Sequence, residues 1–147
     1  MTDDIYAIKS FYLSDILTIH YHSLSFSGTE SAPVNFWTHD KWKTRQLLDK
    51  EGLPHINYTT HFPFYFDFEK LNALWQKYNM LKESYVFEDV YFNAIEHEPP
   101  VIDSSIRLGI WSHSIYHKNF DKALMTPNIK FVCNSVKGWS KELENSL

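Results

Sequence analysis

The chain has 147 residues, enough for one domain that buries about two thirds of the surface of its unfolded form. Its composition, 44% hydrophobic residues with only 4 glycines and 6 prolines, excludes a disordered chain. The net charge of −4 argues against nucleic-acid binding, because the scattered basic residues form no stripe that would neutralise phosphates.

The cysteine and hydropathy patterns indicate a reducing, aqueous compartment. The single cysteine, Cys133, excludes an internal disulfide, and its apolar setting in IKFVCNS favours a buried and inert thiol. No stretch approaches the roughly 20 apolar residues of a membrane span, and the acidic N-terminus is unlike a signal peptide. We therefore expect a cytoplasmic protein without a membrane span.

The first strands are predicted from apolar runs near the N-terminus. A strand-like stretch follows Asp4, and LTIHYHSLSF (17–26) alternates polar and apolar residues with the period of a half-buried strand. His20 and His22 share its polar side, which we interpret as the outer face of an edge strand. The segment SGTESAP (27–33) is typical of a loop.

A helix and a further strand are predicted next. HDKWKTRQLLDKEGLP (39–54) indicates a short helix that is capped near Thr38 or Asp40 and ends at Gly52. HINYTTHFPFYF (55–66) returns to strand-like alternation. The residues expected on one face of that strand are Ile56, Tyr58, Thr60 and Phe62.

Two amphipathic helices follow. Asp67 is a suitable N-cap for a helix over 68–78, and a second helix is predicted within SYVFEDVYFNAIEHE (84–98), which ends before Pro99. The apolar stripe of the first helix comprises Phe68, Leu71, Leu74, Trp75 and Tyr78. The inward residues of the second are Val86, Phe87, Val90, Tyr91 and Ala94.

The C-terminal third completes an interleaved pattern. It predicts one short extended piece in 100–112, a buried strand in 128–135 and an amphipathic helix in 138–147. Strands that alternate with helices indicate an α/β fold, bordering on α+β, in a single domain over 1–147. The strand count is low for a free-standing sheet, which fits a fragment of a larger one.

Two adjacent carboxylates, Asp3 and Asp4, precede the first predicted strand. Carboxylates at a strand end are hard oxygen ligands, suited to a Mg²⁺ or Mn²⁺ ion that bridges a diphosphate. The alternative is a solvated tail, because chain termini commonly fray.

The histidine of TTHFPFYF is a second candidate. His61 lies at a predicted strand end directly before Phe62 and Pro63, where side chains can converge on a ligand. Its ring can ligate a metal or bind a phosphate or sugar hydroxyl. The alternative is a histidine bonded to a loop carbonyl. His97 is expected on the solvated surface.

A third candidate group lies on the helix of SYVFEDVYFN. On a helical wheel the apolar stripe excludes Asp89 and Asn93, which lie four residues apart beside Tyr85, and Glu88 lies at the stripe's edge. A carboxylate and an amide that project together can activate and orient an acceptor hydroxyl. The alternative is an ordinary exposed helix face.

Four segments together resemble a known family. MTDDIYAIKS (1–10) resembles the acidic metal-site motif of GT-A-type glycosyltransferases. HFPFYFDFEKLNALWQKY (61–78), SYVFEDVYFNAI (84–95) and FVCNSVKGW (131–139) are similar to downstream blocks of bacterial and phage glycosyltransferase-like proteins, related in pattern to the Stealth-type hexose-phosphate transferases. The resemblance spans nearly the whole chain and implies a partial GT-A-like mixed sheet flanked by helices.

The resemblance implies a role for each candidate group. Asp3 and Asp4 would hold Mn²⁺ or Mg²⁺ and the nucleotide sugar, and His61 would assist the metal or the donor phosphate. Asp89 or Glu88 would be the catalytic base. The substrate-binding residues would be Asn93, which would position the acceptor, and Tyr85, together with His61.

In the family that the chain resembles, nucleotide-binding βα units come before these motifs. The chain is therefore expected to be the acceptor-side half of a GT-A-like domain, whose activity would depend on its other half. The expected reaction transfers a sugar or sugar phosphate from a nucleotide donor to a carbohydrate. The alternative is a non-catalytic remnant that binds carbohydrate or protein, and exposed edge strands favour a homodimer or a partner chain. The enzyme interpretation requires Asp3, Asp4, His61 and Asp89 to face a common cleft.

Overall fold

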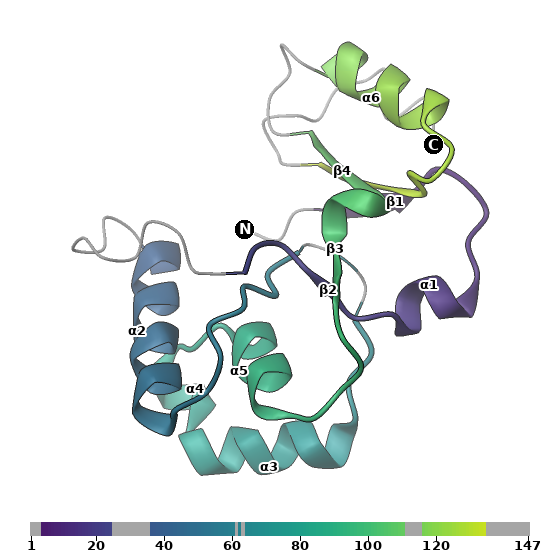
Figure 1. Cartoon of the computed structure of the whole chain (residues 1–147). Helices are drawn as coiled ribbons and strands as arrows, with labels where there is room; N and C mark the ends of the chain where they lie inside the picture. Colours follow the sequence, from purple (N-terminus) through teal and green to yellow (C-terminus); the bar gives the residue numbers. More distant parts are fainter. Residues whose placement is uncertain (1–3, 25–35, 61, 63, 111–115, 135–147) are drawn as a thin grey trace. The chain divides into compact units, whose positions relative to one another are not determined.

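The computed structural model describes residues 4–24, 36–60, 62, 64–110 and 116–134 (Figure 1). These residues form two compact units, each assembled from segments that are distant in sequence. The described residues of the first unit lie within Met1–Thr18, His61–Phe64 and Asp103–Leu147, and those of the second within Ile19–Thr60 and Tyr65–Ile102. The single domain predicted over the whole chain stays a prediction.

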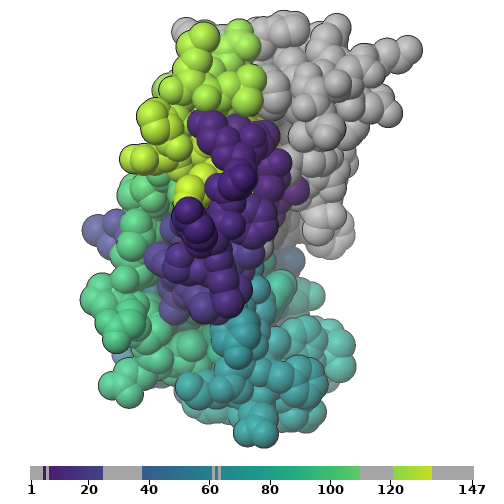
Figure 2. Space-filling view, turned by 90° about the vertical axis from the view of Figure 1, so that its right-hand side faces the viewer, coloured from purple at the N-terminus to yellow at the C-terminus, as the bar shows by residue number. Residues whose placement is uncertain are grey.

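The first unit is built on a mixed three-stranded sheet. Strands β1 (Asp4–Ala7), β5 (Phe131–Asn134) and β4 (Arg107–Ile110) lie in the order β1-β5-β4. β1 runs antiparallel to β5, and β4 runs parallel to it. Parallel neighbours need a long connection, and helix α6 (Tyr116–Met125) lies within it. In the space-filling view the N-terminal segment lies directly against the C-terminal part, as this pairing requires (Figure 2).

Both faces of this sheet carry apolar side chains. On one face Val132 of β5 packs with residues from α6 and the loop after it, and on the other Phe131 packs with Phe62. The first cluster comprises Ala123, Ile129 and Val132, with Ile8 and Leu108 beside it. The second comprises Phe62, Ile106 and Phe131, with Ile5 beside it. The predicted strand in 128–135 and the buried thiol of Cys133 are confirmed.

Side chains near the N-terminus hold the end of α6. The ammonium of Lys9 donates to the carbonyl oxygens of Ala123 and Thr126, 3.0 and 2.6 Å away. A cation at this position satisfies carbonyls that the helix itself leaves without partners. Lys130, just before β5, pairs with Asp15 of the short helix α1 (Leu13–Leu17).

The second unit is mainly helical (Figure 1). Its helices are α2 (Phe36–Glu51), α3 (Phe68–Tyr78), α4 (Met80–Glu83) and α5 (Phe87–Ala94). They share a core cluster of Leu47, Tyr78, Met80 and Val90, with Leu74, Trp75 and Tyr85 packed against it. Both predicted amphipathic helices are therefore confirmed in type. Phe68 and Phe87, expected to face inward, are instead exposed.

The helix ends follow local chemistry. The Asp67 carboxylate accepts hydrogen bonds from the N–H groups of Glu69 and Lys70, which confirms the predicted N-cap of α3. α2 ends directly before Gly52, whose φ of +65° is a conformation that glycine adopts without strain. The N-cap predicted near Thr38 or Asp40 is wrong, because α2 already begins at Phe36.

The strand predicted over 17–26 is mostly absent among the described residues. Leu17 belongs to α1, and only β2 (His20–Tyr21) is extended and paired, with the parallel strand β3 (Val101–Ile102). His20 is buried, so its interpretation as part of an outer polar face is wrong. The predicted loop 27–33 lies outside the described residues.

The segment 55–66 also differs from its prediction. It forms no strand in its described part and makes only an isolated antiparallel bridge between Asn57 and Ser23. Four consecutive residues, 57–60, are buried, whereas strand alternation would expose every second one. Side chains of α5 make hydrogen bonds to the backbone of this segment that a neighbouring strand would otherwise make.

The stretch 100–112 was expected to hold one extended piece but contains β3, the short 3₁₀ helix η1 (Asp103–Ser105) and β4. The sequence analysis also missed α6, and the helix predicted over 138–147 lies outside the described residues. The chain belongs to the mixed α/β class. In the described part of the chain, no helix is long and apolar enough to cross a membrane.

Candidate functional site

The acid and amide of α5 are buried. Asp89 is 0% exposed and Asn93 6% exposed, although the sequence analysis placed both opposite the helix's inward face. The reason is that α5 is covered on two sides. Val90 faces the helical core cluster, while Asp89 and Asn93 face the extended segment Ile56–Thr59.

Asp89 and Asn93 bind the backbone of this segment. The Asp89 carboxylate accepts the N–H of Tyr58 at 2.5 Å through Oδ1 and the hydroxyl of Thr59 at 3.0 Å through Oδ2. The Asn93 amide accepts the N–H of Ile56 at 3.1 Å and donates to its carbonyl at 2.7 Å. The two side chains thus satisfy backbone groups that would otherwise be buried without partners.

A lysine from α2 reaches the same segment. Lys41 Nζ donates to Asn57 Oδ1 at 3.0 Å, and the same oxygen accepts the N–H of Thr59 at 3.0 Å. Thr59 in turn donates its hydroxyl to Asp89. These hydrogen bonds connect α2, the segment and α5 in one continuous network.

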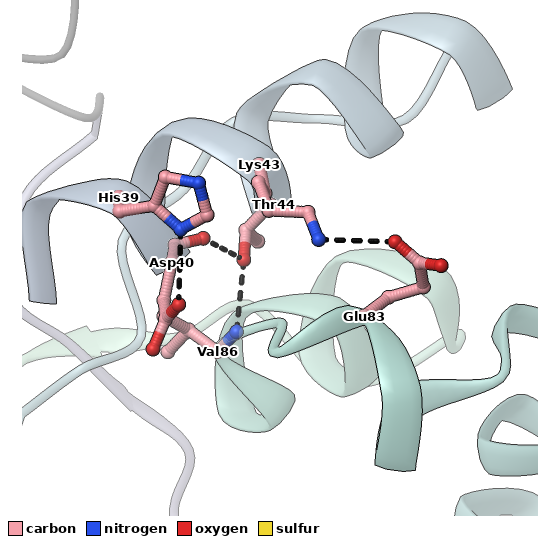
Figure 3. Close-up of polar contacts among 6 residues, drawn as sticks. All are labelled: His39, Asp40, Lys43, Thr44, Glu83 and Val86. Atoms are coloured by element: carbon pink, nitrogen blue, oxygen red, sulfur yellow. Dashed lines mark hydrogen bonds and ion pairs between the residues drawn. The ribbon is translucent and has the colours of Figure 1, made fainter. Parts of the chain in front are cut away.

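The α2–α5 junction also fixes the N-terminus of α5 (Figure 3). The Thr44 hydroxyl donates to the carbonyl of Asp40 at 2.7 Å and accepts the N–H of Val86, the N-cap residue of α5, at 2.8 Å. On the same side, Lys43 pairs with Glu83 of α4 at 3.0 Å. The first turn of α5, which carries Glu88 and Asp89, is therefore held from α2.

Burial perturbs the proton affinities of these groups. It raises the pKa of Asp89 to about 6, although Lys41 and the hydrogen bonds from the segment oppose the shift. Burial also raises the pKa of Glu88, which remains partly exposed, and lowers the pKa of Lys41. A partly exposed carboxylate with raised proton affinity is suited to accept a proton from a bound hydroxyl.

Tyr58 lies inside this group. Its phenol oxygen is 3.2 Å from His97 Nε2, and its ring packs on Phe92 with centroids 5.2 Å apart. Burial and the Asp89 carboxylate raise the pKa of Tyr58 to about 12, so the phenol stays protonated. His97 was expected on the solvated surface but is half-buried, with Nε2 2.8 Å from the carbonyl oxygen of Phe92 and Nδ1 2.7 Å from that of Glu98.

The remaining predicted site residues are only partly described. Asp3 and His61 lie outside the described residues, and of Asp4 only the backbone, which begins β1, is described. Tyr85 is partly buried against the helical core, with the Lys43 ammonium 5.7 Å from its ring centroid. The predicted common cleft stays a prediction.

No group of three His, Cys, Asp or Glu side chains suited to a metal ion occurs among the described residues. The side chains expected to hold Mn²⁺ or Mg²⁺, those of Asp3, Asp4 and His61, lie outside the described part of the chain, so the metal stays a prediction.

Sequence reasoning missed Lys41, Asn57 and Thr59. One signal was available for Lys41, which lies three residues before Thr44 and seven before Leu48, on the side of α2 that those two buried residues define. Asn57 and Thr59 carried no comparable signal, because the alternation in 55–66 indicated a strand.

No family model, curated protein or solved structure matches the chain.

Substituting Asn for Asp89 is expected to remove a pH dependence of stability. Because the folded state raises this pKa above its ordinary 3.8, stabilisation from Asp89 is full below that value and is lost as the pH rises through about 6. Relative to Asp89→Asn, the wild type should lose roughly 3 kcal/mol of unfolding free energy between about pH 4 and 7. Urea denaturation at several pH values measures this difference.

The exposed carboxylate of Glu96, two residues after α5, supplies the control. Glu96→Gln should keep the wild-type pH dependence. If Asp89→Asn also keeps it, the raised pKa of Asp89 is wrong.

Proposed function

We propose that the chain is the acceptor-side part of a glycosyltransferase-like protein that transfers a sugar or sugar phosphate from a nucleotide donor to a carbohydrate hydroxyl. The observation that carries this proposal is the pair of adjacent carboxylates at the start of α5. Asp89 is buried with a hydrogen bond to each of its oxygens, whereas Glu88 is partly exposed and has a raised pKa. One carboxylate thus fixes the local backbone while the other remains accessible.

Glu88 is the residue that we assign as general base. In sugar transfer its carboxylate takes the proton of the acceptor hydroxyl as that oxygen bonds to the anomeric carbon. The bond from the anomeric carbon to the donor's phosphate oxygen breaks, and the nucleotide diphosphate leaves with the electron pair. Asp89 and Asn93 act as positioning residues, because their polar atoms already bind the segment Ile56–Thr59.

The donor side of the proposal rests on the sequence resemblance alone. It assigns Asp3, Asp4 and His61 to a Mn²⁺ or Mg²⁺ ion and the nucleotide sugar. Such an ion would neutralise charge on the leaving diphosphate.

Glu88→Gln is expected to reduce transfer strongly, because glutamine cannot accept the acceptor's proton. We expect kcat to fall by roughly 10²–10⁴-fold with little change in KM. The measurement is product formation from a panel of nucleotide sugars and oligosaccharide acceptors. Glu96→Gln, at an exposed position two residues after α5, should leave transfer near the wild-type rate. Equal rates for Glu88→Gln and the wild type would contradict the assignment.

Asp4→Ala is expected to abolish metal-dependent donor binding. Calorimetric titration of the protein with a nucleotide sugar should release heat only when Mn²⁺ is present, and the variant should release none. Asp121→Ala, at an exposed position on α6, serves as the control. Identical heats for Asp4→Ala and the wild type would remove the metal from the proposal.

A non-catalytic carbohydrate-binding module is the second candidate function, and exposed rings at the start of α3 favour it. Tyr65 is 65% exposed and Phe68 79% exposed. The chain between them is held firmly, because Phe66 packs against Tyr91 with ring centroids 5.0 Å apart and the Asp67 N–H donates to the Tyr91 hydroxyl. Exposed rings on a backbone held in this way are suited to stack on the apolar face of a sugar.

If this module is the function, Tyr65→Ala and Phe68→Ala should each weaken carbohydrate affinity by about fivefold or more, without any effect of EDTA. Binding to a glycan array followed by calorimetry on the best glycan measures this. Leu81→Ala provides the control, since that side chain is 83% exposed and carries no ring. Equal losses in all three variants would exclude specific stacking.

A further inference from the structure

The ring of Phe66 packs on the face of α5 that carries Glu88. Tyr91 and Phe92 follow Glu88 by three and four residues, and residues with this spacing share one side of a helix. The Phe66 ring contacts both, with its centroid 5.0 Å from that of Tyr91 and 5.5 Å from that of Phe92. It also contacts Phe87, the residue directly before Glu88, at 5.5 Å. The segment that contains Phe66 is therefore held against the helical turn that carries the Glu88 carboxylate.

The backbone that follows Phe66 is held to the same helix. The Asp67 N–H donates to the Tyr91 hydroxyl at 2.9 Å. The Asp67 carboxylate caps α3, because it accepts two N–H groups of the first turn at 3.0 and 3.1 Å. The start of α3 thus has a defined position relative to α5, and so do the side chains that it carries.

Two large rings on this segment are exposed. Tyr65, directly before Phe66, is 65% exposed, and Phe68, the first residue of α3, is 79% exposed. Together they leave a large apolar area in water, and a ligand that covers the rings gains free energy from the burial of that area. Because Phe66 lies between them in the sequence, both rings are carried beside the Glu88 face of α5.

The groups around the two rings favour a carbohydrate as the ligand. Tyr65 itself has a phenol hydroxyl, and the exposed carboxylate of Glu69 directly follows Phe68. A sugar has an apolar face that a ring can cover and hydroxyl groups that bind such oxygens. An apolar protein partner would need a continuous apolar patch. Here a half-buried ring and a capping carboxylate separate the two exposed rings in the chain.

We propose that Tyr65 and Phe68 bind the second and later sugar units of the acceptor, so that the acceptor is an oligosaccharide and not a free monosaccharide. The inference rests on the proposed function, in which Glu88 takes the proton of a hydroxyl on the terminal sugar. The units behind that sugar extend past the exposed ring of Phe87 toward the two rings. Tyr65 and Phe68 do not touch the reacting atoms. They determine specificity, because only an acceptor of sufficient length reaches them.

The test measures transfer to acceptors of one, two and three sugar units. The probes are glucose, cellobiose and cellotriose, together with the same length series of whichever glycan in the acceptor panel is used fastest. In the wild type kcat/KM should rise with acceptor length. Tyr65→Ala and Phe68→Ala should each lower the ratio of kcat/KM for the trisaccharide to kcat/KM for the monosaccharide by about fivefold or more. The loss should appear in KM for the trisaccharide and not in kcat, because these rings bind the substrate away from the reacting atoms.

Leu81→Ala is the matched control. It removes an exposed apolar side chain of α4 that has no ring, and it should leave the ratio at the wild-type value. Both ring variants should fold, because the side chains that they lose are exposed. A wild-type ratio in both ring variants overturns the inference and leaves the proposed function standing. An equal fall of the ratio in all three variants also overturns it, because the loss would then not depend on a ring.

Calorimetry with the same trisaccharides separates the inference from the proposed function. Glu88→Gln should bind them without transfer, and adding Tyr65→Ala or Phe68→Ala to it should weaken the affinity by about fivefold or more. If these variants lose affinity but the wild type transfers to no acceptor, the proposed function fails, and the rings belong to a binding module and not to an acceptor site. If no trisaccharide binds, the inference is overturned and a protein partner becomes the occupant to test.

Discussion

The second unit depends on one interaction, the binding of an extended backbone segment by side chains of a helix. Asp89 and Asn93 of α5 take the hydrogen-bonding positions that a neighbouring strand would otherwise occupy along Ile56–Thr59. Buried backbone groups must be paired, so this segment can lie inside the unit without belonging to a sheet. This arrangement buries the Asp89 carboxylate, which is energetically unfavourable for a charged group and therefore raises its pKa.

The proposed site follows from the same arrangement. Asp89 binds the segment and is buried, so its carboxylate is unavailable to a ligand. The adjacent Glu88 lies on the same helical turn and remains accessible. The Lys41 ammonium binds Asn57 of the segment and is within electrostatic reach of both acids. In the proposed function the two neighbouring acids have different tasks: Asp89 holds the backbone segment, and Glu88 would accept the proton.

The sequence predicted those elements whose signals are local. The Asp67 cap, the amphipathic helices and the buried strand around Cys133 depend on nearby residues, and the structure confirms them. The burial of Asp89 was not predictable, because a helical wheel shows one apolar stripe and cannot show that a polar face meets a backbone segment. The prediction of a strand over 55–66 is wrong for a related reason, because this segment is paired with side chains of a helix and not with a neighbouring strand. Roles for Asp3, Asp4 and His61 remain predictions.

The parallel pairing of β2 with β3 has a consequence for folding. His20 lies opposite Val101, and the Val101 N–H donates to the carbonyl of Ile19, so the second unit holds its two chain ends side by side. The first unit must join Asp4 to Asn134, a closure that would otherwise span almost the entire polypeptide. Once the intervening segment has folded, its ends are already adjacent, and the entropy lost on closing that loop is correspondingly smaller. We therefore expect hierarchical assembly, in which the second unit forms early and strands β1 and β5 of the first unit associate last.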